Sequence, residues 1–150
     1  MFISCTPDLY AILDIYAHVL RMYTLLSWIR GGDILKWFDC YIDSVVGLDI
    51  SEKEIDEART RLAAFKREGW TQCSAKPRHV NYQFHECAVL GVEEIAWPSK
   101  FEAVSCMYAV HYFFSSRDVF KTYLLNVYNA LSDRGVFFGT VPSGKVHYVY

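Results

Sequence analysis

The sequence has 150 residues, 53% of them hydrophobic, so it is long enough to form one domain around its own core. Its formal net charge is −2 and its fifteen lysines and arginines are scattered, which excludes the basic stripe of a general nucleic-acid binder but allows a locally recognised nucleotide. The five cysteines are widely spaced and form no C-x-x-C pair, which argues for reduced intracellular thiols and against a zinc site or a disulfide framework.

The N-terminal part of the chain is apolar but interrupted by charges. Apolar residues recur at helical spacing over Asp8–Leu20, which predicts an amphipathic helix. Asp14, His18 and Arg21 interrupt the apolar stretch, and charged groups are costly in the middle of a bilayer. The basic start of a signal peptide is also missing. We therefore expect a single domain over residues 1–150 that does not associate with a membrane.

A short β-prone run over Tyr23–Trp28 is followed by Gly31 and Gly32. This pattern predicts a strand that leads into a helix over Asp33–Cys40, with continuation of the first helix as the alternative. Glycines let backbone amides approach a ligand, and the start of a helix attracts anions. The turn is therefore a candidate nucleotide site, although a glycine pair is more often an ordinary turn.

The stretch "SVVGLDIS", residues Ser44–Ser51, predicts a buried strand with an acidic residue at its end. Ser51 and Glu54 have the spacing of a capping box, in which each side chain accepts a hydrogen bond from the amide of the other residue. We expect the helix that begins there to end at about Glu68.

The remaining elements alternate between strand and helix. They are expected strands over Arg78–His85 and Phe101–Met107, a helix capped by Ser115 or Ser116 that ends at about Leu131, a turn at Asp133–Gly135 and a strand over Gly135–Val141. This alternation predicts an α/β fold with an open, mostly parallel sheet and flanking helices. In such sheets ligands bind at the carboxyl ends of the strands.

Acidic residues follow two of the predicted strands. Asp49 lies sixteen residues beyond Asp33, close to the spacing at which an acid after a glycine-rich turn holds a ribose diol. The alternative is that Asp49 only helps to start a helix. After the third strand come His85, Glu86 and Cys87. One carboxylate there could accept from an exocyclic amine such as that of adenine, but the three could also form an ordinary surface loop. Adjacent residues point in different directions, so the trio cannot ligate one metal ion.

The stretch "CMYAVHYFF" follows the fourth predicted strand. Its aromatic residues and histidine could form a stacking and hydrogen-bonding wall for a base. The alternative places Tyr108, Phe113 and Phe114 in the core. For His111 and Tyr112 we favour a functional role, because a polar–aromatic pair is an awkward choice for filling a core. No Ser-His-Asp order, H-E-x-x-H motif or paired-carboxylate spacing supports a hydrolase.

Together these stretches resemble the mRNA cap guanine-N7 methyltransferases, S-adenosylmethionine-dependent enzymes with the Rossmann-like class I methyltransferase fold. The string "RGGDILKW" is similar to the end of the family motif GxGKGGDLxKW, "VVGLDIS" to VGxDIS, "HEC" to ADC, "CMYAVHYFF" to CQFALHYxF and "GVFFGTVP" to GGxFIGTxP. Order and spacing agree from Arg30 to Pro142. The resemblance implies methyl transfer from S-adenosylmethionine to N7 of the guanine cap of mRNA, with no metal.

The resemblance also implies roles for individual residues. Those that it places at the cofactor are Arg30, Gly31, Asp49, Glu86, Cys87 and Met107. Those that it places at the guanine or the cap phosphates are Lys36, Tyr108, His111, Tyr112 and Pro142. Tyr108, His111 and Tyr112 would position the guanine. No acid, base or covalent nucleophile is needed, because guanine N7 already has a lone pair and the sulfonium methyl is already activated, so alignment and a suitable field can supply most of the acceleration.

The sequence departs from the family pattern at the first strand. Leu25, Ser27 and Ile29 stand where the family has an aspartate and two glycines, and the branched side chain of Ile29 would occupy space that the cofactor needs. A second alignment matches "SWIR" to the upstream family segment NNWIK and leaves the chain without its first strand. The family also continues with further strands beyond the position of Pro142. We therefore expect a fragment, a shortened variant or a degenerate copy.

Two rival functions remain open from the sequence. The first is a non-catalytic relative that supports an active capping enzyme, and the second is a methyltransferase that acts on a small molecule. The resemblance implies capped RNA, and other capping enzymes, as partners. It implies an intracellular location, in the nucleus, with the cytoplasm as the alternative.

Overall fold

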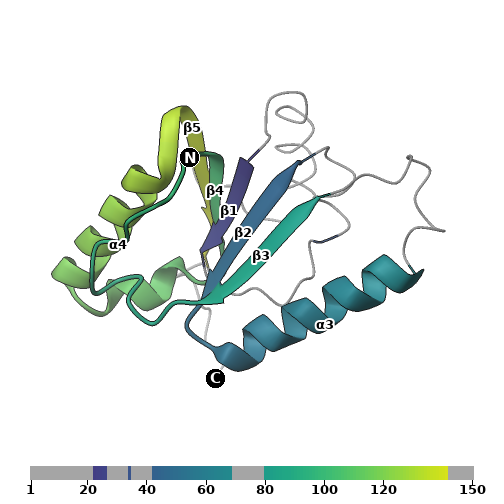
Figure 1. Cartoon of the computed structure of the whole chain (residues 1–150). Coiled ribbons are helices and arrows are strands. Elements are labelled where there is room, and N and C mark those ends of the chain that lie inside the picture. The colour runs from purple at the N-terminus through teal and green to yellow at the C-terminus, as the bar shows by residue number, and fades with distance from the viewer. Residues whose placement is uncertain (1–21, 27–33, 35–41, 69–79, 142–150) are drawn as a thin grey trace, which may run out of the picture.

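The structure is a computed structural model that describes residues 22–26, 34, 42–68 and 80–141. These residues form a parallel sheet flanked by helices (Figure 1). The strands are β1 (Met22–Leu26), β2 (Ser44–Asp49), β3 (Asn81–Glu86), β4 (Phe101–Met107) and β5 (Leu131–Thr140). The helices are α3 (Glu52–Glu68), the 3-10 helix η2 (Val110–Ser115) and α4 (Arg117–Ala130).

The strand order is β3-β2-β1-β4-β5, and each neighbouring pair is parallel. The central strand β1 pairs with β2 on one side and with β4 on the other, so Thr24 lies between Val46 and Val104. From β1 the chain continues to β2 and then to β3 at the edge of the sheet, and it then crosses back to β4 on the other side of β1. The strand order therefore reverses between β1 and β4, and ligands of open α/β sheets bind at the carboxyl ends beside such a reversal.

The predicted strand over Tyr23–Trp28 is confirmed as β1, and its continuation as a helix is wrong. The alternative alignment without a first strand is also wrong, because β1 occupies the centre of the sheet. The predicted helix over Asp8–Leu20 and the glycine turn lie outside the described residues. So does the helix over Asp33–Cys40, except for Ile34, which is helical and buried.

The later elements follow the prediction with one correction. Ser116 caps α4, because its Oγ accepts from the Val119 amide at 3.2 Å. The expected turn at Asp133–Gly135 is wrong, since β5 already begins at Leu131. The pairing of β4 with β5 shifts between Phe101 and Ala103, and the residues before Val136 are accommodated by this irregularity. No separate turn is needed between α4 and β5, because the end of α4 leads directly into a strand that runs parallel to β4.

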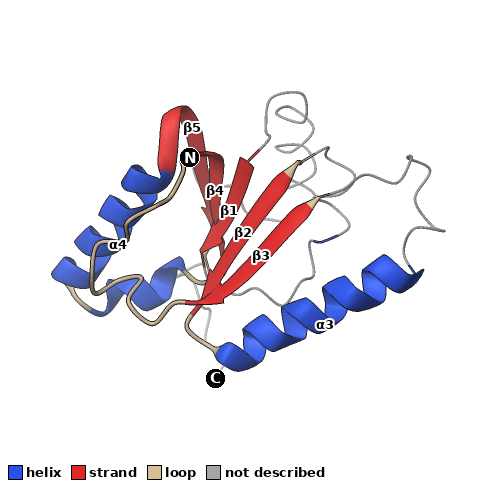
Figure 2. Ribbon diagram, in the orientation of Figure 1, coloured by secondary structure: helices blue, strands red, loops and turns tan. Residues whose placement is uncertain are grey.

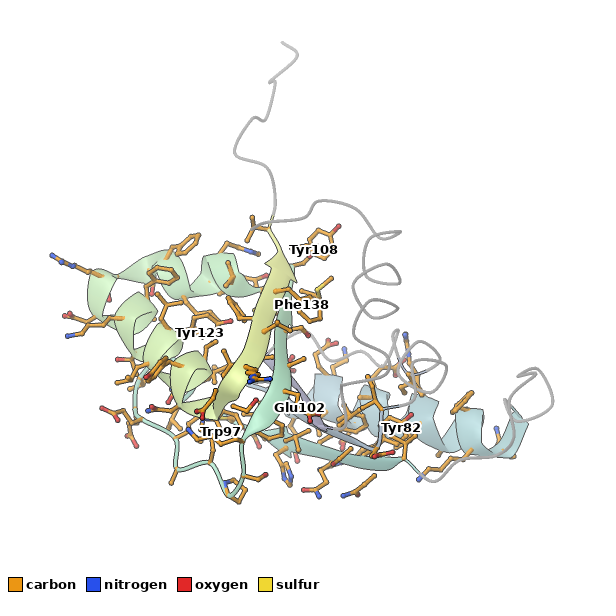
Figure 3. The ribbon with its side chains drawn as sticks, turned by 90° about the horizontal axis from the view of Figure 1, so that it is seen from above. Tyr82, Trp97, Glu102, Tyr108, Tyr123 and Phe138 are labelled. Atoms are coloured by element: carbon orange, nitrogen blue, oxygen red, sulfur yellow. The ribbon has the colours of Figure 1, made fainter. Side chains whose placement is uncertain are left out.

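The core lies on both faces of the sheet. On one face, Ile55, Ala58 and Leu62 of α3 form a helical stripe that packs on β2 and β3. On the other face, Tyr123 and Val127 of α4 pack on β4, and Figure 3 shows Tyr123 between helix and sheet. Within the described part of the chain, no helix combines the length and apolar character needed to cross a membrane.

A loop rather than a helix connects β3 to β4, as Figure 2 shows. This loop runs over residues 87–100 and begins at the carboxyl edge of the sheet. Such a long crossover without a helix has to satisfy its backbone groups in another way. The side chain of Asn126 in α4 bonds to three of these backbone groups, and Asn126 thereby also holds one wall of the candidate site.

Candidate functional site

A cavity of about 570 Å³ opens at the carboxyl ends of β2 and β3. Three segments line it: the β2–α3 junction, the start of the loop after β3, and η2 with the first turn of α4. Its volume falls in the range of small-molecule sites, about 300–1,000 Å³. These segments are distant in sequence, and the parallel sheet brings them together at one edge.

Asp49 is the last residue of β2 and its carboxylate lines the cavity. Although it is acidic, it is only 4% exposed. Its Oδ1 accepts from the Ser51 amide at 2.9 Å, and its carbonyl oxygen accepts from the Cys87 amide at 2.7 Å. The Ser51 amide thus fixes the carboxylate, and the Cys87 amide fixes the backbone that carries it. A carboxylate can accept several hydrogen bonds, so it can bind a vicinal diol while it also orders the chain.

Ser51 caps α3, as expected. Its Oγ accepts from the Glu54 amide at 3.4 Å, which is one half of the predicted capping box. The amide of Ser51 itself donates to Asp49. The predicted helix start is confirmed, and the Ser51 amide connects it to the Asp49 carboxylate at the end of β2.

Asn126 of α4 holds the loop that forms one wall of the cavity. It is completely buried. Its Nδ2 donates to the carbonyls of Leu90 and Glu93 at 2.7 and 2.8 Å, and its Oδ1 accepts from the Ile95 amide at 2.8 Å. The Asn126 carbonyl also accepts from Trp97 Nε1 at 3.1 Å.

Sequence reasoning missed Asn126. The available signal was a polar residue inside the apolar stripe of the helix over Arg117–Ala130, between Tyr123 and Val127. A buried amide at such a place needs partners, and a nearby helix-free crossover supplies them.

The rim of the cavity is apolar and exposed. Ile50, Val92 and Tyr112 line the cavity, yet they are 67%, 68% and 61% exposed. Exposed apolar groups around a concave site suit the face of a planar ring. Sequence reasoning did not single out Ile50 or Val92, because isolated aliphatic residues in loops carry no motif.

Gly91 lets the loop lie against η2 and α4. A Cβ at this position would lie 2.9 Å from Phe113 Cδ1 and 3.0 Å from Val119 Cγ1. The absence of a side chain therefore sets the width of the cavity at this wall.

The chain turns sharply after β4. Tyr108 has a φ of 55°, and it is the one non-glycine residue with positive φ in the described ranges. Its amide donates to the Thr140 carbonyl at 2.8 Å and to Thr140 Oγ1 at 3.1 Å. Its side chain is 43% exposed and lies beyond the ends of β4 and β5, as Figure 3 shows.

The segment η2 carries the predicted aromatic wall. The rings of His111 and Tyr112 lie 4.2 Å apart between centroids, tilted by 36°. The Nδ1 atom of His111 is buried and has no hydrogen-bond partner among the described residues. Buried polar atoms without a partner are rare in native proteins, so the surroundings of this nitrogen require an explanation.

The interpretation of the neighbouring aromatic residues as core holds only in part. Phe113 stacks on Tyr123 with centroids 4.0 Å apart, so its placement in the core is confirmed. Phe114 is 56% exposed and touches Phe120 edge-on, and Tyr108 is also exposed. For these two residues the core interpretation is wrong, because Tyr108 lies in the turn after β4 and Phe114 lies on η2, a 3-10 helix that packs on the surface of α4.

The described site residues divide into two groups. Asp49, Cys87 and Tyr112 line the cavity together. Met107, Tyr108 and His111 follow at the end of β4 and are not among its described lining residues.

Glu86 pairs with Asp49 in the sheet register but is exposed. It borders a second cavity of about 400 Å³ over β2 and β3. Four predicted site residues, Arg30, Gly31, Lys36 and Pro142, lie outside the described residues, as do Ser27 and Ile29 of the altered glycine motif. In the ranges that the structure describes, no group of three or more metal-ligating side chains is close enough to hold an ion.

Residues 16–148 match the family model of the mRNA (guanine-N(7))-methyltransferase domain. The chain belongs to this family. It is 31% identical over 119 residues to the mRNA cap guanine-N(7) methyltransferase of Schizosaccharomyces pombe, covering 78% of this chain and 31% of that protein. It is 29% identical over 136 residues to mRNA cap guanine-N(7) methyltransferase 1 of Oryza sativa subsp. japonica, covering 90% and 36%. The chain thus spans about a third of the length of these relatives.

Solved structures show the same fold. An S-adenosylmethionine-dependent methyltransferase from Clostridium acetobutylicum has a TM-score of 0.60 at 18% identity, covering 86% of this chain and 47% of that one. A methyltransferase from Thiobacillus denitrificans, solved with S-adenosyl-L-homocysteine, has a TM-score of 0.57 at 16% identity, covering 88% and 47%. The predicted class I methyltransferase fold is confirmed.

Proposed function

We propose that this chain carries the methyl-transfer site of an mRNA cap guanine-N7 methyltransferase, with S-adenosylmethionine as the methyl donor. The observation that supports this most strongly is the shared cavity of Asp49 and Tyr112. A buried carboxylate from one side of the sheet and an exposed aromatic ring from the other face the same space, in a chain of this family.

The cavity fits the nucleoside part of the cofactor. The Asp49 carboxylate binds the ribose hydroxyls, and the apolar side chains of Ile50 and Val92 cover the adenine. When bound, S-adenosylmethionine supplies an activated methyl group. By resemblance, Arg30, Gly31, Glu86, Cys87 and Met107 complete the cofactor site.

The guanine is held by the group at the end of β4. Tyr112 offers the face of its exposed ring for stacking, and the ring of His111 lies 4.2 Å from it and supports it. Tyr108, which precedes them in the chain, is also exposed. By resemblance, Pro142 contributes to this site and Lys36 contacts the cap phosphates. These residues orient N7 and exclude water, and none of them has to move a proton.

Titration with S-adenosylhomocysteine tests the cofactor part of this proposal. The wild-type chain should bind in the micromolar range by calorimetry. Asp49→Asn keeps an oxygen that accepts from the Ser51 amide but removes the charge, so affinity should fall about 10- to 100-fold. No binding by the wild type at millimolar ligand would contradict the proposal and favour the non-catalytic rival. Equal binding by Asp49→Asn would remove Asp49 from the site.

Methyl transfer to a cap analogue tests the guanine part. His111→Ala should lower kcat/KM at least tenfold while affinity for S-adenosylhomocysteine stays within about twofold. Tyr128→Ala is the matched control, because it removes an aromatic ring that is 76% exposed on α4. Near-normal methylation by His111→Ala would contradict the assignment. Transfer to uncapped guanine compounds as efficient as transfer to the cap analogue would favour a small-molecule methyltransferase.

A further inference from the structure

The amide of Tyr108 has two acceptors on one residue. Thr140, the last residue of β5, offers its carbonyl oxygen at 2.8 Å and its Oγ1 at 3.1 Å. Its side chain is only 7% exposed. The carbonyl contact follows from the sheet register, in which Met107 pairs with Thr140. The hydroxyl contact does not follow from the register and depends on the side chain.

The backbone at Tyr108 is strained. A left-handed φ is unfavourable for a residue with a side chain, and glycine is the usual choice there. Aromatic residues seldom adopt this conformation unless the surrounding structure enforces it. Here the two bonds from Thr140 act on the amide of the strained residue itself. Burial of Ala109 and Val110 holds the chain on the other side.

The conformation at Tyr108 determines where the next residues point. The left-handed turn ends β4 and directs Tyr108 outward, and η2 starts two residues later with His111 and Tyr112 in ring contact. A relaxed, right-handed or extended Tyr108 would rotate the start of η2 relative to the sheet. The orientation of the whole aromatic group therefore depends on this one peptide.

We propose that Thr140 is a positioning residue of the guanine site, whose hydroxyl holds Tyr108 in its left-handed conformation and so orients Tyr108, His111 and Tyr112. This inference rests on the proposed function for the identity of the ligand. It predicts that the hydroxyl of Thr140 affects the guanine more than the cofactor, because of the three residues that it orients only Tyr112 is among the described residues that line the cavity with Asp49.

The test compares Thr140→Val with Thr140→Ser in the full chain. Valine keeps the size and the main-chain carbonyl but loses the hydroxyl acceptor, whereas serine keeps the hydroxyl. Thr140→Val should raise KM for a cap analogue about five- to tenfold, with affinity for S-adenosylhomocysteine within about twofold of wild type. Thr140→Ser should restore KM to within about twofold. Amide hydrogen exchange at Tyr108 should be about tenfold faster in Thr140→Val alone.

Each result of these measurements either supports the role of Thr140 or overturns it. An unchanged KM in Thr140→Val overturns the inference. Equal losses of cap and S-adenosylhomocysteine binding, unrescued by serine, show a purely structural threonine and also overturn it. If the wild type itself does not methylate the cap analogue, the proposed function fails. In that case the exchange rates still decide whether Thr140 holds the strained peptide.

Discussion

The two halves of the sheet's carboxyl edge hold their side chains by different means. In the β2–β3 half, residues 49–51 and 87–95, hydrogen bonds from Ser51 and Asn126 satisfy the polar groups of the chain. In the β4–β5 half, residues 107–112 and 139–141, the strained peptide of Tyr108 sets the geometry. In the β2–β3 half, hydrogen bonds to buried polar groups fix the side-chain positions. In the β4–β5 half, the left-handed conformation of Tyr108, which its neighbours enforce, fixes them. Substitutions should therefore affect the two halves differently.

The largest effect should come from Asn126→Ala. This change leaves the Ile95 amide and the Leu90 and Glu93 carbonyls without their partner. Each orphaned group costs about 1–3 kcal/mol, and some regain water, so we expect a loss of about 4 kcal/mol in the free energy of unfolding. Urea denaturation measures it. Affinity for S-adenosylhomocysteine should fall as well, because the loop forms the cavity wall.

Leu124→Ala is the matched control on the same helix, since Leu124 is 40% exposed. It should cost less than about 1 kcal/mol. If Asn126→Ala costs no more than this control, packing of Leu90 and Ile95 holds the loop, and the contrast between the halves is wrong.

Gly139→Ala should have the next largest effect. A Cβ on Gly139 would overlap the carbonyl oxygen of Cys106 on the neighbouring strand, and neither backbone can yield without parting β4 from β5. We expect a loss of about 3 kcal/mol together with weaker cap binding. Unfolding in urea and a cap-analogue titration measure these two quantities.

Gly91→Ala is the corresponding change in the other half. Its Cβ meets the side chains of Phe113 and Val119, which can rotate away, so the cost should be about 1 kcal/mol. Affinity for S-adenosylhomocysteine, rather than for the cap, should fall. Equal costs for the two substitutions would show that the backbone contact in the β4–β5 half is no tighter than a side-chain contact.

Much of this architecture was predictable from the sequence. The buried run before Asp49, the serine caps at Ser51 and Ser116 and the apolar stripe of α4 are local signals, and each predicted its element. Because carboxyl ends of parallel strands meet at one edge, the gathering of Asp49, Cys87 and Tyr112 also followed from the order of elements.

The rest depended on contacts between distant residues. Asn126 holds residues more than thirty positions earlier in the chain, and no local pattern encodes those partners. The left-handed Tyr108 was equally hidden, since an aromatic residue is a poor signal for positive φ. The turn expected at Asp133–Gly135 failed because the turn residues were absorbed by a shift in strand pairing, which depends on β4.

An effect confined to alkaline pH concerns Cys106, which lies beneath the β4–β5 half and is completely buried. Burial raises the pKa of its thiol from 9.0 to about 11. Above pH 9 the unfolded chain therefore loses a proton that the native chain keeps. The native state then binds more protons than the unfolded state, so stability falls as pH rises through this window.

Burial also raises the pKa of Tyr123 and Tyr82 above the ordinary tyrosine range, so these residues add to the loss at higher pH. Between about pH 8 and pH 10 the tyrosines contribute equally to wild type and Cys106→Ala, so the difference between the two proteins isolates the cysteine, whose share should be about 1 kcal/mol. Urea unfolding of wild type and Cys106→Ala across this interval measures it, with the offset near pH 7 subtracted. Parallel pH profiles would show that the thiol ionises in the folded protein as easily as in the unfolded chain, and that the β4–β5 half is not sealed from water beneath its strained peptide.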